Sequence, residues 1–295
     1  MASTGVPLLF QTAVNPLSTT FSYVLFGVIG TFTSLIVTYH TLDVLQDQFS
    51  SFNDVEDTFD FVIVGAGSAG SVLANRLSED YKVLVLEAGG EPNPLHSIPV
   101  LSLFLLNIPH VDWQYFTTPQ KKSCLAMNNR QCAWPRGKAL GGSSNLNFMI
   151  YIRGHPKDFD HWANVTGDPK WEYENVLPFF KKSEDYHGDW DVGRYHAHGG
   201  NLNVAQPSYV GMAEMFCEAG KEFGYPRTDL NAEFKEGCSP IYYTQKNGRR
   251  FGTYKAFIEP IRDRKNLYIY KFSHVTKIMN RSTGAFGILE DSSQS

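Results

Sequence analysis

The chain has 295 residues, with 26 basic against 30 acidic side chains and a formal net charge of −4. This balance lacks the basic excess of a nucleic-acid-binding protein, so we expect no nucleic-acid partner. Aromatic residues make up 14% of the chain, which argues against intrinsic disorder and fits a packed core. The length allows one large domain or two smaller ones.

The first part of the chain is apolar and uncharged. No Asp, Glu, Lys or Arg precedes Asp43, and Phe21–Thr38 is dense in Val, Ile, Leu and Phe over a length close to the minimum for spanning a bilayer. A cleaved secretory signal normally begins with basic residues, and this segment does not. We therefore expect a signal-anchor that associates with the membrane through 21–38, with the body of the chain luminal, extracellular or anchored outside. The alternative is the buried first helix of a soluble domain.

The stretch Phe59–Gly70 has the pattern of a dinucleotide-binding βαβ unit. Phe61–Val64 is predicted to be a buried parallel strand, and a helix is expected at Ser71–Glu79. Between them lie three glycines with Gly-x-Gly-x-x-Gly spacing, namely Gly65, Gly67 and Gly70. Such glycines allow a tight turn, the approach of a pyrophosphate to the backbone, and close packing of the helix on the strand.

A second apolar strand, Lys82–Leu86, ends at Glu87. A carboxylate at this place can accept hydrogen bonds from both ribose hydroxyls of an adenosine. The succession of strand, glycines, helix, strand and acid indicates a dinucleotide site far more strongly than the glycines alone. NAD and FAD fit this unit equally well.

A second glycine-rich stretch runs from Trp134 to Gly154. Pro135 and three glycines bend the chain sharply, and short polar side chains follow before another apolar run. Bare amides beside hydroxyl groups form a good nest for a phosphate or a flavin edge. A turn-rich surface loop is the alternative interpretation.

Both glycine-rich stretches resemble signatures of the glucose-methanol-choline (GMC) oxidoreductases, which are flavoproteins that oxidise alcohols. The matching residues are Gly65–Gly70 with Glu87-Ala-Gly-Gly, and Gly137–Asn147. The resemblance extends from about Phe59 to about Glu290 and is greatest with the insect glucose-dehydrogenase-like branch. It implies an α/β fold, in which an FAD/NAD(P)-binding Rossmann-like domain is joined to part of an α+β substrate-binding domain and is incomplete at the C-terminus.

The family pattern also implies FAD as the cofactor and assigns residues to it. The first glycines would hold the pyrophosphate, Glu87 the adenosine ribose, and the second glycine-rich stretch the flavin and its ribityl chain, while the backbone amide of Val275 would meet the adenine. The expected cofactor-binding residues are Gly65, Gly67, Ser68, Ala69, Gly70, Glu87, Ala139, Gly142, Ser143, Asn147, Phe148, Met149, Ile150 and Val275. Leu146 stands where some members carry a histidine that bonds covalently to the flavin, so we expect a dissociable cofactor.

The same resemblance divides the chain into four segments. Residues 1–56 would hold the hydrophobic signal-anchor and a linker, and 57–155 the first part of the FAD-binding domain. Residues 156–230 would form a helical substrate-cap segment, and 231–295 the second, truncated part of the FAD-binding domain.

Outside the glycine-rich stretches, the sequence predicts further helices and the surroundings of three histidines. Lys157–Asp185 is predicted to form one or two helices, and Gly211–Phe223 another. The apolar stripe of the latter should pack in the core; it consists of Met212, Met215, Phe216, Ala219 and Phe223. Three histidines in a Gly-rich loop are expected to be solvated rather than to bind a metal; they are His187, His196 and His198.

The four cysteines fall into two pairs, for which we expect different roles. Cys124 and Cys132 lie eight residues apart and would close a small disulfide loop in a secretory protein, whereas in the cytosol they would be free thiols. Cys217 and Cys238 show no recognisable spacing, and packing in the core is the simpler expectation for both.

The resemblance implies oxidation of CH–OH groups in an alcohol or sugar, with hydride transfer to flavin and with quinone or oxygen as the electron acceptor. The family's proton-accepting histidine and its partner come from a C-terminal segment that no position here matches. We therefore assign no catalytic residue and expect the N-terminal part of a larger enzyme. Two alternatives remain: a flavin-binding protein without catalysis, and a nicotinamide-dependent dehydrogenase built on the same βαβ unit.

Overall fold

The computed structural model describes residues 16–50, 58–233, 235–280 and 286–291. Its central feature is a three-stranded parallel sheet with the order β1-β2-β9, formed by Phe61–Val64, Val83–Leu86 and Leu267–Tyr270. Each strand pairs in register over four residues, and β9 comes from a part of the chain far from the other two. Two distant segments of sequence therefore build one sheet.

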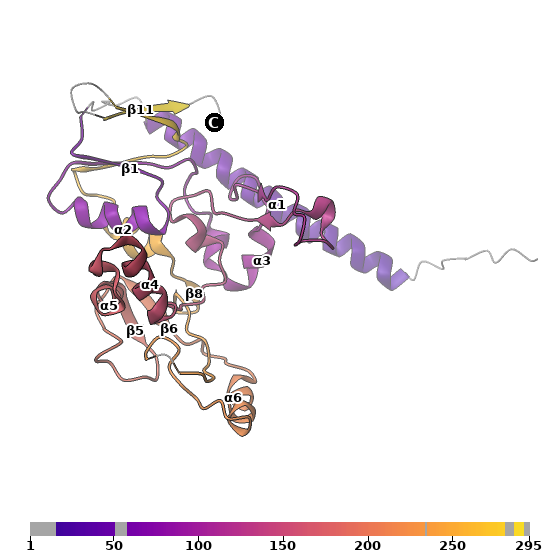
Figure 1. The fold of residues 1–295 in the computed structure, drawn as a ribbon. Coiled ribbons are helices and arrows are strands. Elements are labelled where there is room, and N and C mark those ends of the chain that lie inside the picture. The colour runs from indigo at the N-terminus through magenta and orange to yellow at the C-terminus, as the bar shows by residue number, and fades with distance from the viewer. Residues whose placement is uncertain (1–15, 51–57, 234, 281–285, 292–295) are drawn as a thin grey trace, which may run out of the picture.

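Helix α2 (Ser68–Leu77) joins β1 to β2 and completes the predicted βαβ unit (Figure 1). It begins three residues before the expected Ser71. The reason is that Gly67 has an extended conformation and acts as the N-cap, so the chain becomes helical directly after it. All four residues of β2 are buried, because this strand lies between the other two.

Strand β1 is less buried than its apolar sequence indicated. Phe61, Val62 and Val64 are 40%, 41% and 50% exposed, and only Ile63 is buried. Among the residues that the structure describes, β1 pairs with β2 alone and so forms an edge of the sheet. The expectation of a fully buried strand was wrong for this reason.

The core beneath the sheet combines α2 with a late segment of the chain. Ile63, Ala74, Val83 and Val85 pack with residues of the π-helix Tyr254–Ile258. Burial of each large apolar side chain contributes about 1.5–3 kcal/mol. The core therefore fixes the position of the first glycine-rich loop, which connects β1 to α2.

Helix α1 (Pro16–Ser50) is 35 residues long and runs diagonally past the sheet (Figure 1). Within it, Phe26–Asp47 is long and apolar enough to cross a membrane, with a mean hydropathy of 1.3, and it is the one such helix in the described part of the chain. A signal sequence or a core helix meets the same criterion. The helix extends well beyond the apolar run Phe21–Thr38.

The second half of α1 contacts the body of the protein. Ile36 is 1% exposed and packs in a cluster with Leu105, Val111 and Leu146. The Asp43 carboxylate accepts a hydrogen bond of 2.6 Å from the backbone N–H of Glu91 and forms an ion pair with Lys271. These contacts attach α1 to the side of the domain that carries the glycine-rich loops.

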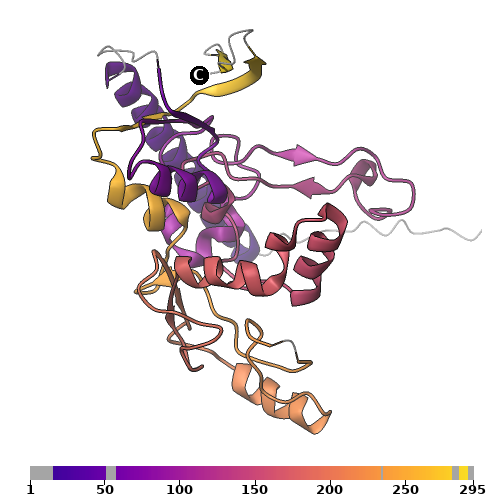
Figure 2. The same cartoon turned by 60° about the vertical axis from the view of Figure 1, so that its left-hand side comes forward.

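A second unit contains two of the predicted helices, α4 (Pro156–Thr166) and α5 (Tyr173–Ser183). Gly167 follows α4 directly and ends it in a left-handed conformation. Strand β5 (Glu184–His187) pairs in parallel with β6 (Leu202–Ala205). Helix α6 (Ala213–Glu222) follows and protrudes from this unit (Figure 2).

The apolar stripe of α6 is exposed, contrary to expectation. Met212, Met215, Phe216 and Phe223 are between 68% and 80% exposed, and Cys217 is the buried residue of the helix. The helix contacts the body through the face that carries Cys217, which is not the face with the most apolar residues.

The remaining elements are short. The strands β3 and β4 form a hairpin arm (Figure 2). A disulfide between Cys124 and Cys132 closes the loop of this arm, so the predicted bridge is confirmed. The other helices and strands are α3 (Ser102–Leu105), η1 (Pro94–Ser97), η2 (Pro99–Leu101), η3 (Asn128–Arg130), η4 (Gly142–Asn145), η5 (Pro169–Trp171), η6 (Tyr254–Ile258), η7 (Glu259–Ile261), β3 (Tyr115–Phe116), β4 (Ala133–Trp134), β7 (Gln245–Lys246), β8 (Arg249–Arg250), β10 (His274–Asn280) and β11 (Phe286–Asp291).

Candidate cofactor-binding site

A cavity of about 610 Å³ lies at the carboxyl ends of β1 and β2. In open parallel sheets this edge is where ligands bind. Five parts of the chain form its wall: the first glycine-rich loop, the end of β2, the segment of Trp113 and Tyr115, the second glycine-rich loop and the start of β10. The lining residues are Val64, Gly65, Gly67, Ser68, Leu86, Glu87, Ala88, Trp113, Tyr115, Arg136, Gly137, Gly142, Ser143, Ser273, His274 and Val275.

The two glycine-rich loops touch each other at the cavity. Gly142 has φ +52°, and a Cβ atom added to it would lie 2.8 Å from the Cα of Gly67. A Cβ on Gly70 would lie 2.0 Å from the carbonyl oxygen of Gly65, which itself has φ +88°. Glycine is therefore required at these positions for close approach and for left-handed backbone geometry.

Gly67 is glycine for a different reason. A Cβ added there would meet no protein atom within 4 Å, and the residue lines the cavity. No side chain caps α2, whose N-terminus begins directly after Gly67. The first N–H groups of a helix lack intrahelical acceptors and carry the positive end of its dipole. The open space beside Gly67 thus faces a place suited to a phosphate.

Glu87 lies at the end of β2 and is 5% exposed. Its two carboxylate oxygens accept hydrogen bonds of 2.8 Å from the N–H groups of Ala66 and Gly89. Burial raises the pKa of Glu87 although both N–H groups, together with Lys138, act in the opposite direction. Each oxygen of a carboxylate has a further lone pair, so Glu87 can also accept hydrogen bonds from a ligand.

The second glycine-rich loop is folded tightly on itself. The Gly137 N–H donates to the Ser143 hydroxyl at 3.2 Å, and a Cβ on Gly137 would lie 2.2 Å from the Gly142 carbonyl oxygen. Further along, the buried Arg250 guanidinium donates to the Ser144 carbonyl and to the Asn147 side chain, at 2.9 and 2.8 Å. These bonds hold the turn that follows the cavity wall.

The structure places half of the predicted site residues at the cavity. Those that line it are Gly65, Gly67, Ser68, Glu87, Gly142, Ser143 and Val275. Those that do not line it are Ala69, Gly70, Ala139, Asn147, Phe148, Met149 and Ile150. Of the residues expected at the flavin end, Gly142 and Ser143 line the cavity, whereas Ala139 and the run 147–150 do not. The cavity therefore corresponds mainly to the adenosine and pyrophosphate end of the expected site.

Sequence reasoning missed several lining residues. Trp113 and Tyr115 stack with ring centroids 5.7 Å apart, and His274 contacts Trp113 edge to face at 5.5 Å. Arg136 precedes the glycine that opens the second loop, and that position was the available signal for it. The two aromatic residues reach the cavity through long-range packing that no local motif encodes.

A smaller cavity of about 220 Å³ adjoins the first and shares Ala88 and His274 with it. Its wall also includes His40 and Val44 of α1. Helix α1 is therefore part of the surroundings of the cofactor-binding site.

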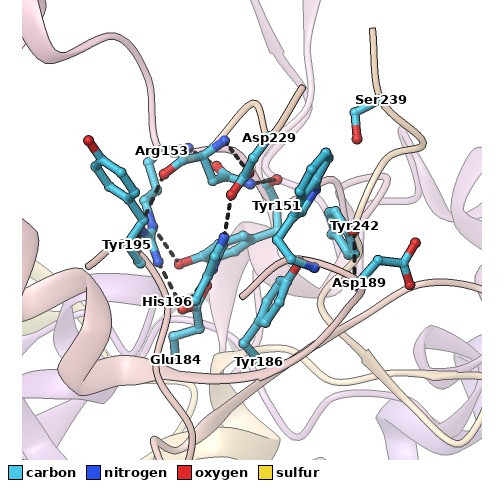
Figure 3. Close-up of polar contacts among 12 residues, drawn as sticks. Tyr151, Arg153, Glu184, Tyr186, Asp189, Tyr195, His196, Asp229, Ser239 and Tyr242 are labelled. Carbon is cyan, nitrogen blue, oxygen red and sulfur yellow. Dashed lines mark hydrogen bonds and ion pairs between the residues drawn. The ribbon is translucent and has the colours of Figure 1, made fainter. Parts of the chain in front are cut away.

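A buried polar network lies in the second unit, and none of its residues lines the large cavity (Figure 3). His196 is 1% exposed, with Nδ1 3.1 Å from both carboxylate oxygens of Glu184 and Nε2 2.7 Å from Asp229 Oδ2. Arg153 Nη2 lies 2.9 Å from Glu184, and the Tyr186 ring stacks on the imidazole at 3.8 Å. The expectation that His196 is solvated was wrong, because β5 and the segment near Asp229 enclose it.

Comparison with known proteins agrees with this geometry. Residues 59–295 match the family model of the GMC oxidoreductases. Glucose dehydrogenase (FAD, quinone) of Drosophila pseudoobscura pseudoobscura is 43% identical over 236 residues, which cover 79% of this chain and 37% of that protein. Oxygen-dependent choline dehydrogenase of Pectobacterium carotovorum is 42% identical over 242 residues, which cover 78% of this chain and 42% of that protein. The chain thus spans about two-fifths of the length of these curated relatives.

Solved structures show the same fold. Pyridoxine 4-oxidase from Mesorbium loti superposes with a TM-score of 0.70 at 35% identity, covering 80% of this chain and 48% of that one. An FAD-dependent oxidoreductase from Chaetomium thermophilum gives a TM-score of 0.71 at 28% identity, covering 81% of this chain and 42% of that one. These likenesses confirm the predicted α/β fold class. Together with the match over residues 59–295, they show that the chain belongs to the GMC oxidoreductase family.

Proposed function

We propose that this chain is the FAD-binding part of an oxidoreductase that acts on CH–OH groups of an alcohol or sugar. The observation that carries the proposal is the cavity in which the two glycine-rich loops meet beside Glu87. The names of the relatives support FAD as the cofactor and CH–OH compounds as donors. A nicotinamide nucleotide would use the βαβ unit but would leave the second glycine-rich loop without a role.

The lining residues fit the adenosine and pyrophosphate parts of FAD. The open space at Gly67 and the uncapped start of α2 suit the pyrophosphate, and the free lone pairs of Glu87 suit the ribose hydroxyls. Val275, at the start of β10, is assigned to the adenine. The residues proposed for the flavin end follow in the turn that Arg250 holds.

FAD, when bound, supplies the redox chemistry by accepting a hydride from the carbon that bears the hydroxyl group. The residues of this chain bind the cofactor, orient it and shield it from water. Leu146 is 3% exposed and packs against Ile36 of α1, so it supports the proposal of a dissociable rather than covalently linked cofactor.

We further propose that 57–155 and 231–295 form one cofactor domain and that 156–230 belongs to the substrate side. The pairing of β9 with β2 supports the first assignment. Quinone or oxygen is the proposed electron acceptor. The proposed location is the secretory route, with α1 as a membrane anchor; the apolar span Phe26–Asp47 and the Cys124–Cys132 disulfide support it.

The experiment is to purify the protein, precipitate it and identify the nucleotide in the supernatant by chromatography and absorbance. The proposal expects FAD, released without proteolysis. A bound nicotinamide nucleotide, or none after incubation with FAD, would contradict it. Oxidation of CH–OH donors is tested on the longest protein that contains these 295 residues, by loss of flavin absorbance without oxygen. If FAD is bound but no alcohol or sugar lowers its absorbance, cofactor binding is supported and the proposed oxidation of CH–OH donors is contradicted.

A further inference from the structure

Two cysteines far from the cofactor cavity lie very close together. The sulfur atoms of Cys217, in α6, and Cys238 are 2.7 Å apart, and Cys217 is 3% exposed. Non-bonded carbon atoms, which are smaller than sulfur, rest at about 3.5–4.0 Å. A disulfide holds its sulfur atoms at about 2.05 Å. The observed separation is therefore too short for two independent thiols, and it lies between a bond length and a non-bonded contact.

The backbone brings these sulfur atoms together. After α6, the Tyr225 N–H donates to the Gly220 carbonyl at 3.0 Å, which turns the chain back along the helix. The Cys238 N–H then donates to Pro226 at 2.9 Å, and the Thr228 N–H donates to Cys238 at 3.0 Å. Cys238 is thus held next to α6 by main-chain hydrogen bonds rather than by a chance side-chain conformation.

We propose that Cys217 and Cys238 form a second disulfide in the mature protein. Both thiols lose their protons, one S–S bond forms, and the two electrons pass to a protein or glutathione disulfide, which is reduced to two thiols. Cys238 is more exposed than Cys217, so it attacks the external disulfide first, and Cys217 then displaces the mixed partner. The Cys124–Cys132 bridge shows that the chain accommodates oxidised cysteines, and the second bridge leaves none unpaired.

This disulfide fastens α6 to the second unit. Cys217 is the buried residue of α6, while Met215 and Phe216 are 68% and 73% exposed. Beside the main-chain hydrogen bond from Tyr225 to Gly220, α6 forms a partly exposed ion pair of 3.4 Å between Arg227 and Glu214. Exposed ion pairs contribute little to stability, so the proposed covalent bond would hold the helix more firmly than this ion pair does.

The test is disulfide mapping of the full chain expressed through a secretory route. The protein is denatured without reductant, its free thiols are alkylated, and it is digested with trypsin. The proposal expects a linked pair of peptides containing Cys217 and Cys238 and no alkylation of either. The Cys124–Cys132 pair in the same sample is the control for oxidising conditions. Alkylation of Cys217 and Cys238 while the control pair stays linked, or crossed pairing among the four, would overturn the proposal.

Hydrogen exchange tests the fastening of α6 in the native protein. Cys217→Ser should speed amide exchange in α6 by more than about tenfold while α4 keeps its protection. Cys124→Ser, which opens the other loop, is the matched control and should leave α6 unchanged. Equal exchange in α6 of wild type and Cys217→Ser would mean that other contacts hold the helix.

Discussion

At the scale of single residues, Gly67 gives the sharpest test of the cofactor site. A Cβ there meets no protein atom within 4 Å, so Gly67→Val should fold normally while filling the space proposed for the pyrophosphate. We expect FAD retention to be abolished, measured by flavin absorbance after gel filtration. Gly193→Val is the matched control, because Gly193 has equally open surroundings and does not line the cavity. Full FAD occupancy in Gly67→Val would reject the pyrophosphate assignment.

Glu87 gives a second prediction, which concerns affinity and pH. Loss of two charge-assisted hydrogen bonds to the ribose in Glu87→Ala should weaken FAD by about 2–4 kcal/mol, roughly thirty- to a thousandfold. Glu79→Ala removes an exposed carboxylate and should leave the affinity unchanged. The measurement is fluorescence titration, and equal affinities of the two variants would assign the ribose to another residue.

The pH dependence of the same affinity follows from the buried carboxylate. Burial raises the pKa of Glu87 above its ordinary value of 4.5. In the proposed complex, the ribose hydroxyls donate to the ionised form. FAD affinity should therefore be constant above the raised pKa and fall as the pH decreases through it. In Glu87→Ala, the affinity for FAD should no longer fall as the pH decreases through this pKa.

Some site residues could be predicted from the sequence because they belong to a short motif. Gly65, Gly67 and Glu87 follow from local strand and turn chemistry, and the structure places all three at the cavity. Trp113 and Tyr115 could not be predicted as lining residues, because they reach the cavity through tertiary packing of the hairpin arm.

At the scale of elements, the contact of His196 with Glu184, the first residue of β5, makes the stability of the fold depend on pH. Burial lowers the pKa of His196, but hydrogen bonds to Asp229 and Glu184 outweigh it and the net pKa is raised above 6.5. The protonated form thus stabilises the fold fully below pH 6.5, and this contribution is lost as the pH rises through the raised pKa.

The corresponding variant is His196→Gln, which leaves Glu184 without its imidazolium partner. Breaking a buried charge pair costs about 3–5 kcal/mol, and the fall of the unfolding temperature between neutral and alkaline pH should become smaller. His187→Gln is the control, since its side chain is 51% exposed. The readout is thermal unfolding across the pH range. An unchanged pH profile in His196→Gln would show that another group titrates.

Element prediction succeeded where periodicity and breakers were strong, as for α4 and α5 on either side of Gly167. The helix expected at Gly211–Phe223 is confirmed as α6, but the expected burial of its apolar stripe was wrong, because such a stripe does not show which face of a helix the fold covers. Element prediction also failed for the burial of β1, which depends on the strands beside it rather than on its own residues.

At the scale of the whole molecule, the orientation across a membrane can be tested at Asn164. This residue lies exposed on α4 in an Asn-Val-Thr acceptor sequence. A luminal body predicts a glycan there, seen as a mobility shift removed by an endoglycosidase and absent in Asn164→Gln. Deletion of residues 1–38 should abolish the shift, because it removes the apolar first half of α1. An unglycosylated full-length chain in the cytosol would contradict the proposed location.

In the proposed complex, the cavity between the two glycine-rich loops binds the adenosine and pyrophosphate parts of FAD. The most direct measurement is a fluorescence titration of the full chain with FAD, in competition with ADP or with FMN. Because the cavity holds Glu87 and the start of α2, whereas Ala139 and the run 147–150 proposed for the flavin end do not line it, ADP should displace FAD and FMN should not. Binding of one FAD per chain with this order of competition is the predicted result. Displacement by FMN and not by ADP, or the absence of saturable FAD binding, would contradict the account.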